Sequence, residues 1–164
     1  AAQAMAALAG AEVTHIKVHG ALNNMACADR DMANAISTAV KAAAPELIML
    51  APALSELAAS SLDHGLTTAI EVFADRAYIP DGQLAPRSRP DAMIHDLAIA
   101  LKNCLRMMAD GEIIALDGSR LKIAADSICV HGDEPSAIAM ARHICLGLMA
   151  AGFEPASLPD MMAG

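Results

Sequence analysis

The sequence contains no tryptophan, one tyrosine and two phenylalanines, and only 18% of its 164 residues are charged. Acidic residues outnumber basic ones, which gives a formal net charge of −8. A nucleic-acid groove needs clustered Lys and Arg, and a helix that lies on a membrane needs a basic amphipathic face. Because neither pattern is present, the sequence predicts no nucleic-acid partner and no membrane partner.

Several motifs of large enzyme classes are also missing, namely GxxxxGK[ST], GxGxxG, GxSxG and HExxH. P-loop nucleotide binding, nucleophile-elbow hydrolysis and zincin chemistry are therefore unsupported. The four cysteines are scattered without a CxxC pair, which favours free thiols in a reducing compartment. No stretch of about 20 uninterrupted apolar residues occurs. These features predict a cytoplasmic protein.

What the chain does have is a 55% hydrophobic composition in which short apolar strands alternate with helical patterns. Such alternation is typical of a parallel α/β fold, and we expect residues 1–164 to form a single domain. An Asp117-Gly118 turn also predicts one hairpin. The strands are expected at 13–18, 47–50, 67–73, 113–116, 121–123 and 127–130, and the helices at 1–9, 30–43, 55–64, 97–108 and 136–151.

Polar residues follow three of the expected strands. His19 and His131 each come directly after a strand and each precede a glycine, and Glu71 to Arg76 closes another strand. Ligands of parallel α/β folds bind at the carboxyl ends of the strands, and imidazole serves as a general acid, a general base or a metal ligand. We expect residues 19–24 to be a polar loop beside this site. A purely structural role for each histidine remains open.

Residues 71–96, called the polar segment below, form the most charged part of an otherwise apolar sequence and contain three prolines. A loop of this length in a compact domain is often functional. Its arginines at 76, 87 and 89 suit a carboxylate or phosphate. An ion pair within the loop among Glu71, Asp75 and Arg76, with no further role, is the alternative. Lys17 is a further candidate contact, and Asp133 with Pro135 is also consistent with an ordinary helix cap.

Five strings together resemble the LamB/YcsF family, whose members are the A subunits of the bacterial ATP-dependent 5-oxoprolinase. They are KVHGALNN (17–24), EVFADRAY (71–78), PRS (86–88), IHD (94–96) and ICVHGDEP (128–135). The resemblance runs from about Glu12 to Glu154. It implies a distorted (β/α) barrel of the glycoside hydrolase/deacetylase type, here a partial one, with parallel strands and flanking helices.

The resemblance further implies hydrolysis of 5-oxo-L-proline to L-glutamate, coupled to ATP cleavage and carried out together with 5-oxoprolinase subunits B and C. A divalent metal such as Mg²⁺ is left open as a cofactor, and so is self-association of the chain. The catalytic candidates are His19, Glu71, Asp75, His131 and Asp133. The candidate contacts for substrate or phosphate are Lys17, Asn24, Arg76, Arg87 and His95.

The chain departs from the family pattern at Val18, where proline is usual, at Asn23, where tyrosine is usual, and at Asp91, where glycine is frequent. It also lacks the N-terminal motifs of the family, so it resembles the C-terminal two-thirds of a member and is expected to be inactive alone. Two alternatives stay open: a metal-dependent amide or carbohydrate deacetylase, and a truncated, non-catalytic subunit.

Overall fold

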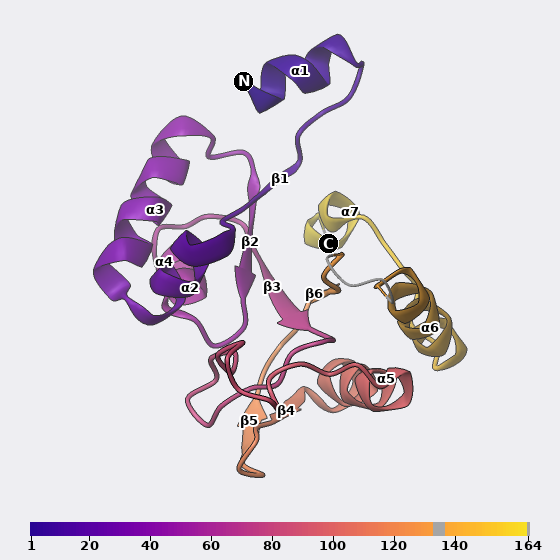
Figure 1. The fold of residues 1–164 in the computed structure, drawn as a ribbon. Helices are drawn as coiled ribbons and strands as arrows, with labels where there is room; N and C mark the ends of the chain where they lie inside the picture. Colours follow the sequence, from indigo (N-terminus) through magenta and orange to yellow (C-terminus); the bar gives the residue numbers. More distant parts are fainter. Residues whose placement is uncertain (133–136, 164) are drawn as a thin grey trace. The chain divides into compact units, whose positions relative to one another are not determined.

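The computed structural model describes residues 1–132 and 137–163 (Figure 1). Helices and strands alternate along the chain, as the sequence predicts. In chain order the elements are α1 (Ala2–Leu8), β1 (His15–Lys17), α2 (Gly20–Ala28), α3 (Arg30–Ala43), β2 (Ile48–Pro52), α4 (Glu56–Asp63), β3 (Thr68–Phe73), α5 (Leu97–Leu105), the π-helical turn η1 (Arg106–Asp110), β4 (Glu112–Ile114), β5 (Arg120–Lys122), β6 (Ser127–Cys129), α6 (Ala137–Ala150) and α7 (Leu158–Met162).

Four strands form one sheet in the order β1-β2-β3-β6. β1 pairs with β2 in parallel, and β3 pairs with β6 in parallel. β4 and β5 form a separate antiparallel hairpin, which confirms the hairpin expected from Asp117-Gly118. With its flanking helices, this parallel sheet confirms the α/β fold that the sequence patterns predict and is consistent with the partial barrel that the resemblance implies. Residues of β2 are buried along its whole length, as expected of a central parallel strand.

The chain divides into two compact units. The first contains Ala1–Ala51, Ser55–Ala69 and the C-terminal segment that starts at Ala156, and the second contains Pro52–Leu54 and Ile70–Pro155. Each unit is described by itself below. The expectation of a single domain stays a prediction.

In the first unit, helices α2, α3 and α4 pack together (Figure 1). Asp29 caps α3 by accepting a hydrogen bond from the backbone N of Met32 at 3.0 Å, and Ser55 caps α4 in the same way through Ala58 at 3.1 Å. Both helices therefore begin where their polar caps predict. Serine hydroxyls on their facing sides are buried, and Ser60 donates to Ser37 at 2.9 Å.

The prediction of a polar loop at residues 19–24 is wrong, because α2 begins at Gly20 and continues through this stretch. Asn23 is a weak helix former, yet it lies on the buried face of α2 together with Ala26 and Cys27. The helical spacing of these three residues, and not their polarity, decides the local structure. A short helix, α7, was also not expected.

In the second unit, α5 and α6 lie side by side (Figure 1). Asp96 caps α5 by accepting from the backbone N of Ile99 at 2.9 Å, as predicted. α5 is shorter than expected, since the chain changes to π-helical bonding at Arg106. Buried Val72 and Phe73 of β3 pack with Met107 and Ile113 to form a core cluster.

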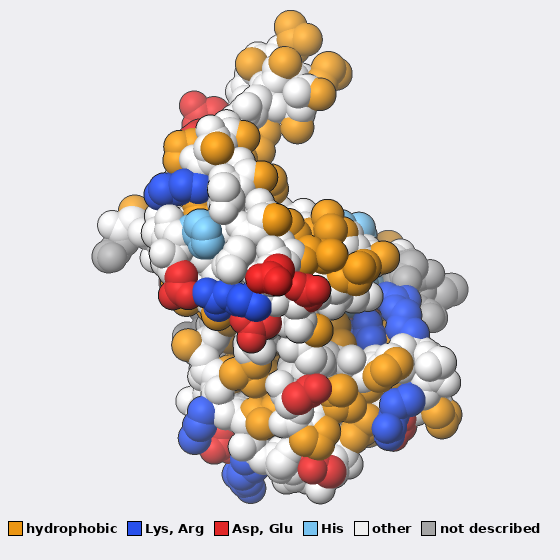
Figure 2. Space-filling model, turned by 90° about the vertical axis from the view of Figure 1, so that its left-hand side faces the viewer, with side chains coloured by type: hydrophobic (Ala, Val, Ile, Leu, Met, Phe, Trp, Pro, Cys, Tyr) orange, Lys and Arg blue, Asp and Glu red, His pale blue; other side chains and the backbone are white. Residues whose placement is uncertain are grey.

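Charged side chains of both signs lie next to one another on the face drawn in Figure 2, with hydrophobic side chains exposed between them. The ion pairs of the described residues include Arg30 with Asp63 and Glu56, and Glu112 with Lys122. The absence of a nucleic-acid partner stays a prediction.

Candidate functional site

Asp75 and His131 form a hydrogen-bonded pair in the second unit, called the Asp75–His131 pair below. Nδ1 of His131 lies 2.8 Å from Oδ2 and 3.0 Å from Oδ1 of Asp75. The backbone N of His131 donates to the same Oδ2 at 3.2 Å. The side chain of Asp75 is 8% exposed and that of His131 is 20% exposed. The carboxylate is therefore buried while the imidazole keeps access to solvent.

The pairing of β3 with β6 explains why these two residues meet. Phe73 is opposite Cys129 in the parallel register. Carrying that register two residues onward places residue 75 opposite residue 131. Because side chains alternate between the faces of a strand, Phe73 and Asp75 share a face, and the ring of Phe73 stacks on that of His131 at 5.7 Å and 15°.

Asp75 determines which imidazole nitrogen is available for chemistry. A carboxylate accepts hydrogen bonds, so the neutral ring carries its proton on Nδ1 and a lone pair on Nε2. The stacked Phe73 ring and the bond from the backbone N of His131 restrict the ring and the carboxylate further. This arrangement, a base oriented by a buried carboxylate, is suited to taking a proton from water or another weak acid.

A small cavity adjoins this pair. Its volume is about 10 Å³, which is close to the space that one water molecule needs. The polar side chains among its lining residues are Asp75, His95 and His131. The structure therefore brings His95, another residue predicted for the site, together with the pair.

The polar segment is folded more tightly than a surface loop. Its backbone forms antiparallel bridges between Arg76 and Met93 and between Tyr78 and Leu84. Tyr78 is buried, and its hydroxyl accepts from the backbone N of Phe73 at 2.9 Å. Burial raises the pKa of the Tyr78 phenol well above its ordinary value, so the ring stays neutral. These contacts hold Asp75 next to β6.

Arg76 is buried, in contrast to the exposed anion contact that its sequence context suggests. Its guanidinium donates to the carbonyl oxygen of Ala85 at 2.6 Å, which braces the polar segment. Arg87 is exposed on the same segment. Arg89 forms a two-point ion pair with Asp91, at 2.9 and 2.8 Å, a pairing that the sequence does not predict.

The remaining predicted site residues lie at several places in the two units. Glu71 is buried on β3 opposite Ser127. His19 is the exposed N-terminal cap residue of α2, and Lys17 and Asn24 lie with it in the first unit. Asp133 lies outside the described residues.

Some features of the site carry no sequence signal. The stacking of Phe73 on His131 and the bond from Phe73 to the Tyr78 hydroxyl join residues whose order in the chain does not predict contact. Within residues 1–132 and 137–163, no group of three His, Cys, Asp or Glu side chains is arranged to hold a metal ion. In the same part of the chain, no helix has the length and apolar character that a membrane span requires.

Comparison with known proteins bears directly on this geometry. The sequence model described as the LamB/YcsF family matches residues 1–163. The chain belongs to the LamB/YcsF family. It is 46% identical over 157 residues to the 5-oxoprolinase A subunit of Azoarcus sp. (strain BH72), covering 96% of this chain and 61% of that protein. It is likewise 46% identical over 152 residues to the 5-oxoprolinase A subunit of Azorhizobium caulinodans, covering 93% and 60%.

A similar fold is also found among solved structures. The crystal structure of the lactam utilization protein from Thermus thermophilus matches with a TM-score of 0.82 and 39% sequence identity, covering 92% of this chain and 60% of the other. The chain thus spans about three-fifths of the length of these LamB/YcsF relatives. The names of the first two describe a subunit, which is a component of a larger assembly. The name of the third describes a lactam utilization protein.

Proposed function

We propose that this chain carries part of the catalytic site of a 5-oxoprolinase A subunit, which hydrolyses 5-oxo-L-proline to L-glutamate with cleavage of ATP. The observation that supports it is the Asp75–His131 pair, in which a buried carboxylate orients a partly exposed imidazole beside a cavity of about 10 Å³. The names of the relatives supply the substrate, and 5-oxoprolinase subunits B and C are the proposed partners.

The chemistry of a lactam explains why ATP is needed. The ring amide is a poor electrophile, and transfer of the γ-phosphoryl group to its oxygen releases ADP and makes the ring carbon open to attack. Water then adds to that carbon, one proton of the water passes to Nε2 of His131, and collapse breaks the ring C–N bond to leave an acyl phosphate. A second water cleaves the acyl phosphate to the carboxylate and free phosphate. The nitrogen that leaves takes up a proton, for which the imidazolium is the donor.

Asp75 stabilises the imidazolium formed in this sequence, because its carboxylate lies 2.8 Å from Nδ1. A divalent metal such as Mg²⁺ would accompany ATP. The described residues offer no group of three ligands for a resident metal, so they do not fit one, and no step above runs through a metal. The deacetylase alternative has no observation in its favour.

The chain spans only 61% of the length of the Azoarcus relative. The test therefore uses a chimera in which that relative supplies the rest of the subunit. Residues of this chain replace the matching segment of that relative, and the chimera is mixed with 5-oxoprolinase subunits B and C. Release of glutamate is measured with and without ATP. We expect ATP-dependent release from the chimera, and the chain alone is assayed in parallel under the same conditions.

Two variants of the chimera probe the pair. His131→Ala and Asp75→Asn are each expected to lower the rate about 10²–10⁴-fold, the usual contribution of general acid–base catalysis. His143→Ala is the matched control, since His143 is exposed on α6 and does not line the cavity. Full activity of His131→Ala would refute the proposed role, and a chimera that releases no glutamate with both partners would refute the function.

A further inference from the structure

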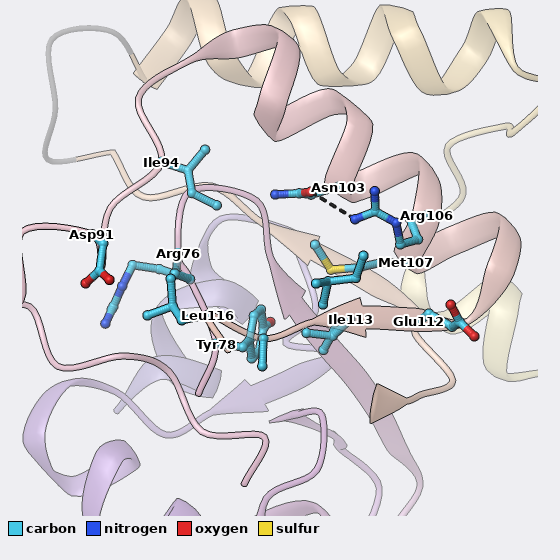
Figure 3. Close-up of a pocket in the computed structure, with 13 residues that line it drawn as sticks. Arg76, Tyr78, Asp91, Ile94, Asn103, Arg106, Met107, Glu112, Ile113 and Leu116 are labelled. Atoms are coloured by element: carbon cyan, nitrogen blue, oxygen red, sulfur yellow. Dashed lines mark hydrogen bonds between the residues drawn. The ribbon is translucent and has the colours of Figure 1, made fainter. Parts of the chain in front are cut away.

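A second and larger cavity lies within the second unit, and no step of the proposed reaction uses it. Its volume is about 170 Å³. Three structural parts line it: the polar segment near Arg76 and Tyr78, the end of α5 with the π-helical turn η1, and strand β4 with the residues that follow it (Figure 3). π-Helical turns often occur at functional sites.

The body of this cavity is apolar. Figure 3 shows the side chains of Tyr78, Met107, Ile113 and Leu116 grouped together, with Ile94 on another side. The hydroxyl of Tyr78 already accepts a hydrogen bond from Phe73, so its ring offers mainly apolar surface. A cavity of about 150 Å³ with such a lining is large enough to hold benzene. The space here suits a ligand of similar bulk.

Two arginines line the cavity: Arg76, which is buried and whose guanidinium donates to the carbonyl oxygen of Ala85, and Arg106. The guanidinium of Arg106 donates to Oδ1 of Asn103 at 3.2 Å, a neutral partner (Figure 3). Among the described residues, Arg106 takes part in no ion pair. Its positive charge is therefore without a counter-ion at the cavity wall, and a guanidinium holds a carboxylate through two parallel hydrogen bonds.

The two acidic residues in the lining do not cancel this charge, because each is already paired with a cation. Asp91 pairs with Arg89 at 2.8 Å. Glu112 accepts from Arg120 at 3.0 Å and from Lys122 at 2.6 Å. The carboxylates would nevertheless repel a second negative charge on a ligand, which disfavours phosphate and other dianions.

We propose that this cavity binds a small organic monocarboxylate with a compact apolar body, and that Arg106 holds the carboxylate. The cavity is distinct from the one beside the Asp75–His131 pair, although Ile94 lines both. Asp75 lines the smaller cavity, while its neighbour Arg76 lines the larger one. The proposal therefore stands independently of the reaction proposed above.

Benzoate is the probe, and benzyl alcohol is the neutral molecule of similar size. Binding to the full chain is followed by two-dimensional NMR, and the affected amides are expected in the polar segment, η1 and β4. We expect benzoate to bind with a dissociation constant on the order of 1 mM. Benzyl alcohol should bind at least about tenfold more weakly, because it cannot pair with Arg106.

Two variants and one control complete the test. Arg106→Gln is expected to weaken benzoate at least about tenfold while leaving benzyl alcohol unchanged. Leu116→Trp fills the cavity from an exposed position and should abolish binding of both probes. Arg142→Gln is the matched control, since Arg142 is exposed on α6 and absent from the lining; benzoate should bind it as it binds the parent.

Three results would overturn the proposal. They are equal affinity of benzoate for the parent and a folded Arg106→Gln variant, equal affinity of the parent for benzoate and benzyl alcohol, and no saturable shifts up to about 20 mM benzoate. Should Arg106→Gln fail to fold, Leu116→Trp decides alone: unaltered benzoate binding in that variant refutes the site.

Discussion

The contact between Gly82 and Leu54 gives a sharp test of how the polar segment is held. Gly82 is buried in the turn between Tyr78 and Leu84, where its backbone N donates to the carbonyl of Ile79 at 2.9 Å. Its φ is +88°, a conformation that residues with a side chain rarely adopt. A Cβ added at this position would lie 2.8 Å from Cβ and from Cδ1 of Leu54. Gly82→Ala therefore meets both a backbone penalty and a clash.

The backbone penalty and the steric clash of Gly82→Ala can be separated by comparison with the same substitution at Gly118. That glycine has the same φ of +88°, but a Cβ there would find nothing within 4 Å. We expect Gly118→Ala to lower the free energy of unfolding by the backbone term alone, about 1–2 kcal/mol. Gly82→Ala adds the overpacking term of about 1–3 kcal/mol, for a total loss of about 2–5 kcal/mol. The difference between the two variants measures the clash.

The assay is urea unfolding followed by circular dichroism, with both variants and the parent at the same pH and temperature. Leu54→Gly removes the atoms that clash, so Gly82→Ala should cost only the backbone term in that background. Equal losses for the two alanine variants in the parent background would refute the reasoning. So would an unchanged cost of Gly82→Ala when Leu54 is replaced by glycine.

Three further predictions concern the cysteines and a helix cap. Burial raises the pKa of the fully buried Cys104 thiol to about 12. The unfolded thiol ionises near pH 8.5, so the unfolded state loses its proton first, and the free energy of unfolding should fall as pH rises from about 9 towards 12. Urea unfolding measured across that range should show a shallower fall in Cys104→Ala. An identical pH slope in the parent and the variant would contradict the prediction. In the native chain Cys145 is exposed while Cys27 and Cys104 are buried, so Cys145 should react first with a thiol reagent under native conditions, as peptide mapping by mass spectrometry would show; early labelling of Cys104 would be inconsistent with its burial. Asp96→Ala removes the hydrogen bond to the backbone N of Ile99 and should cost about 1 kcal/mol in urea unfolding, whereas Asp96→Ser should restore most of it.

The sequence predicts the fold where local signals and burial agree. Asp29 and Ser55 mark the starts of α3 and α4, and the Asp117-Gly118 turn marks the hairpin. The signal misleads at α2, since Asn23 and Asn24 are polar and weak helix formers, whereas burial of one helical face determines the structure. At α7 a usable signal was present, because Ser157 caps the helix by accepting from the backbone N of Asp160.

The candidate site was predicted in part. The strand ends identify Asp75 and His131 as candidates on one side of a sheet, but their contact depends on β6 pairing with β3 directly, and that register is not readable from either strand alone. The burial of Arg76 and the lining role of Arg106 follow from how the polar segment and η1 fold, for which the sequence has no local marker. The roles of His19, Glu71, Arg87 and the other predicted site residues stay predictions.

The Asp75–His131 pair joins residues that are 56 positions apart in the sequence. Between them lie most of the polar segment, α5 and the β4–β5 hairpin, and the helix and hairpin form from contacts between near neighbours. Closing so long a loop costs conformational entropy before any native contact compensates for it. We therefore expect the imidazole to reach its carboxylate late in folding, when β6 docks on β3. A chain that is only partly folded cannot display the oriented base, and hydrogen exchange at the His131 amide reports the docking of β6.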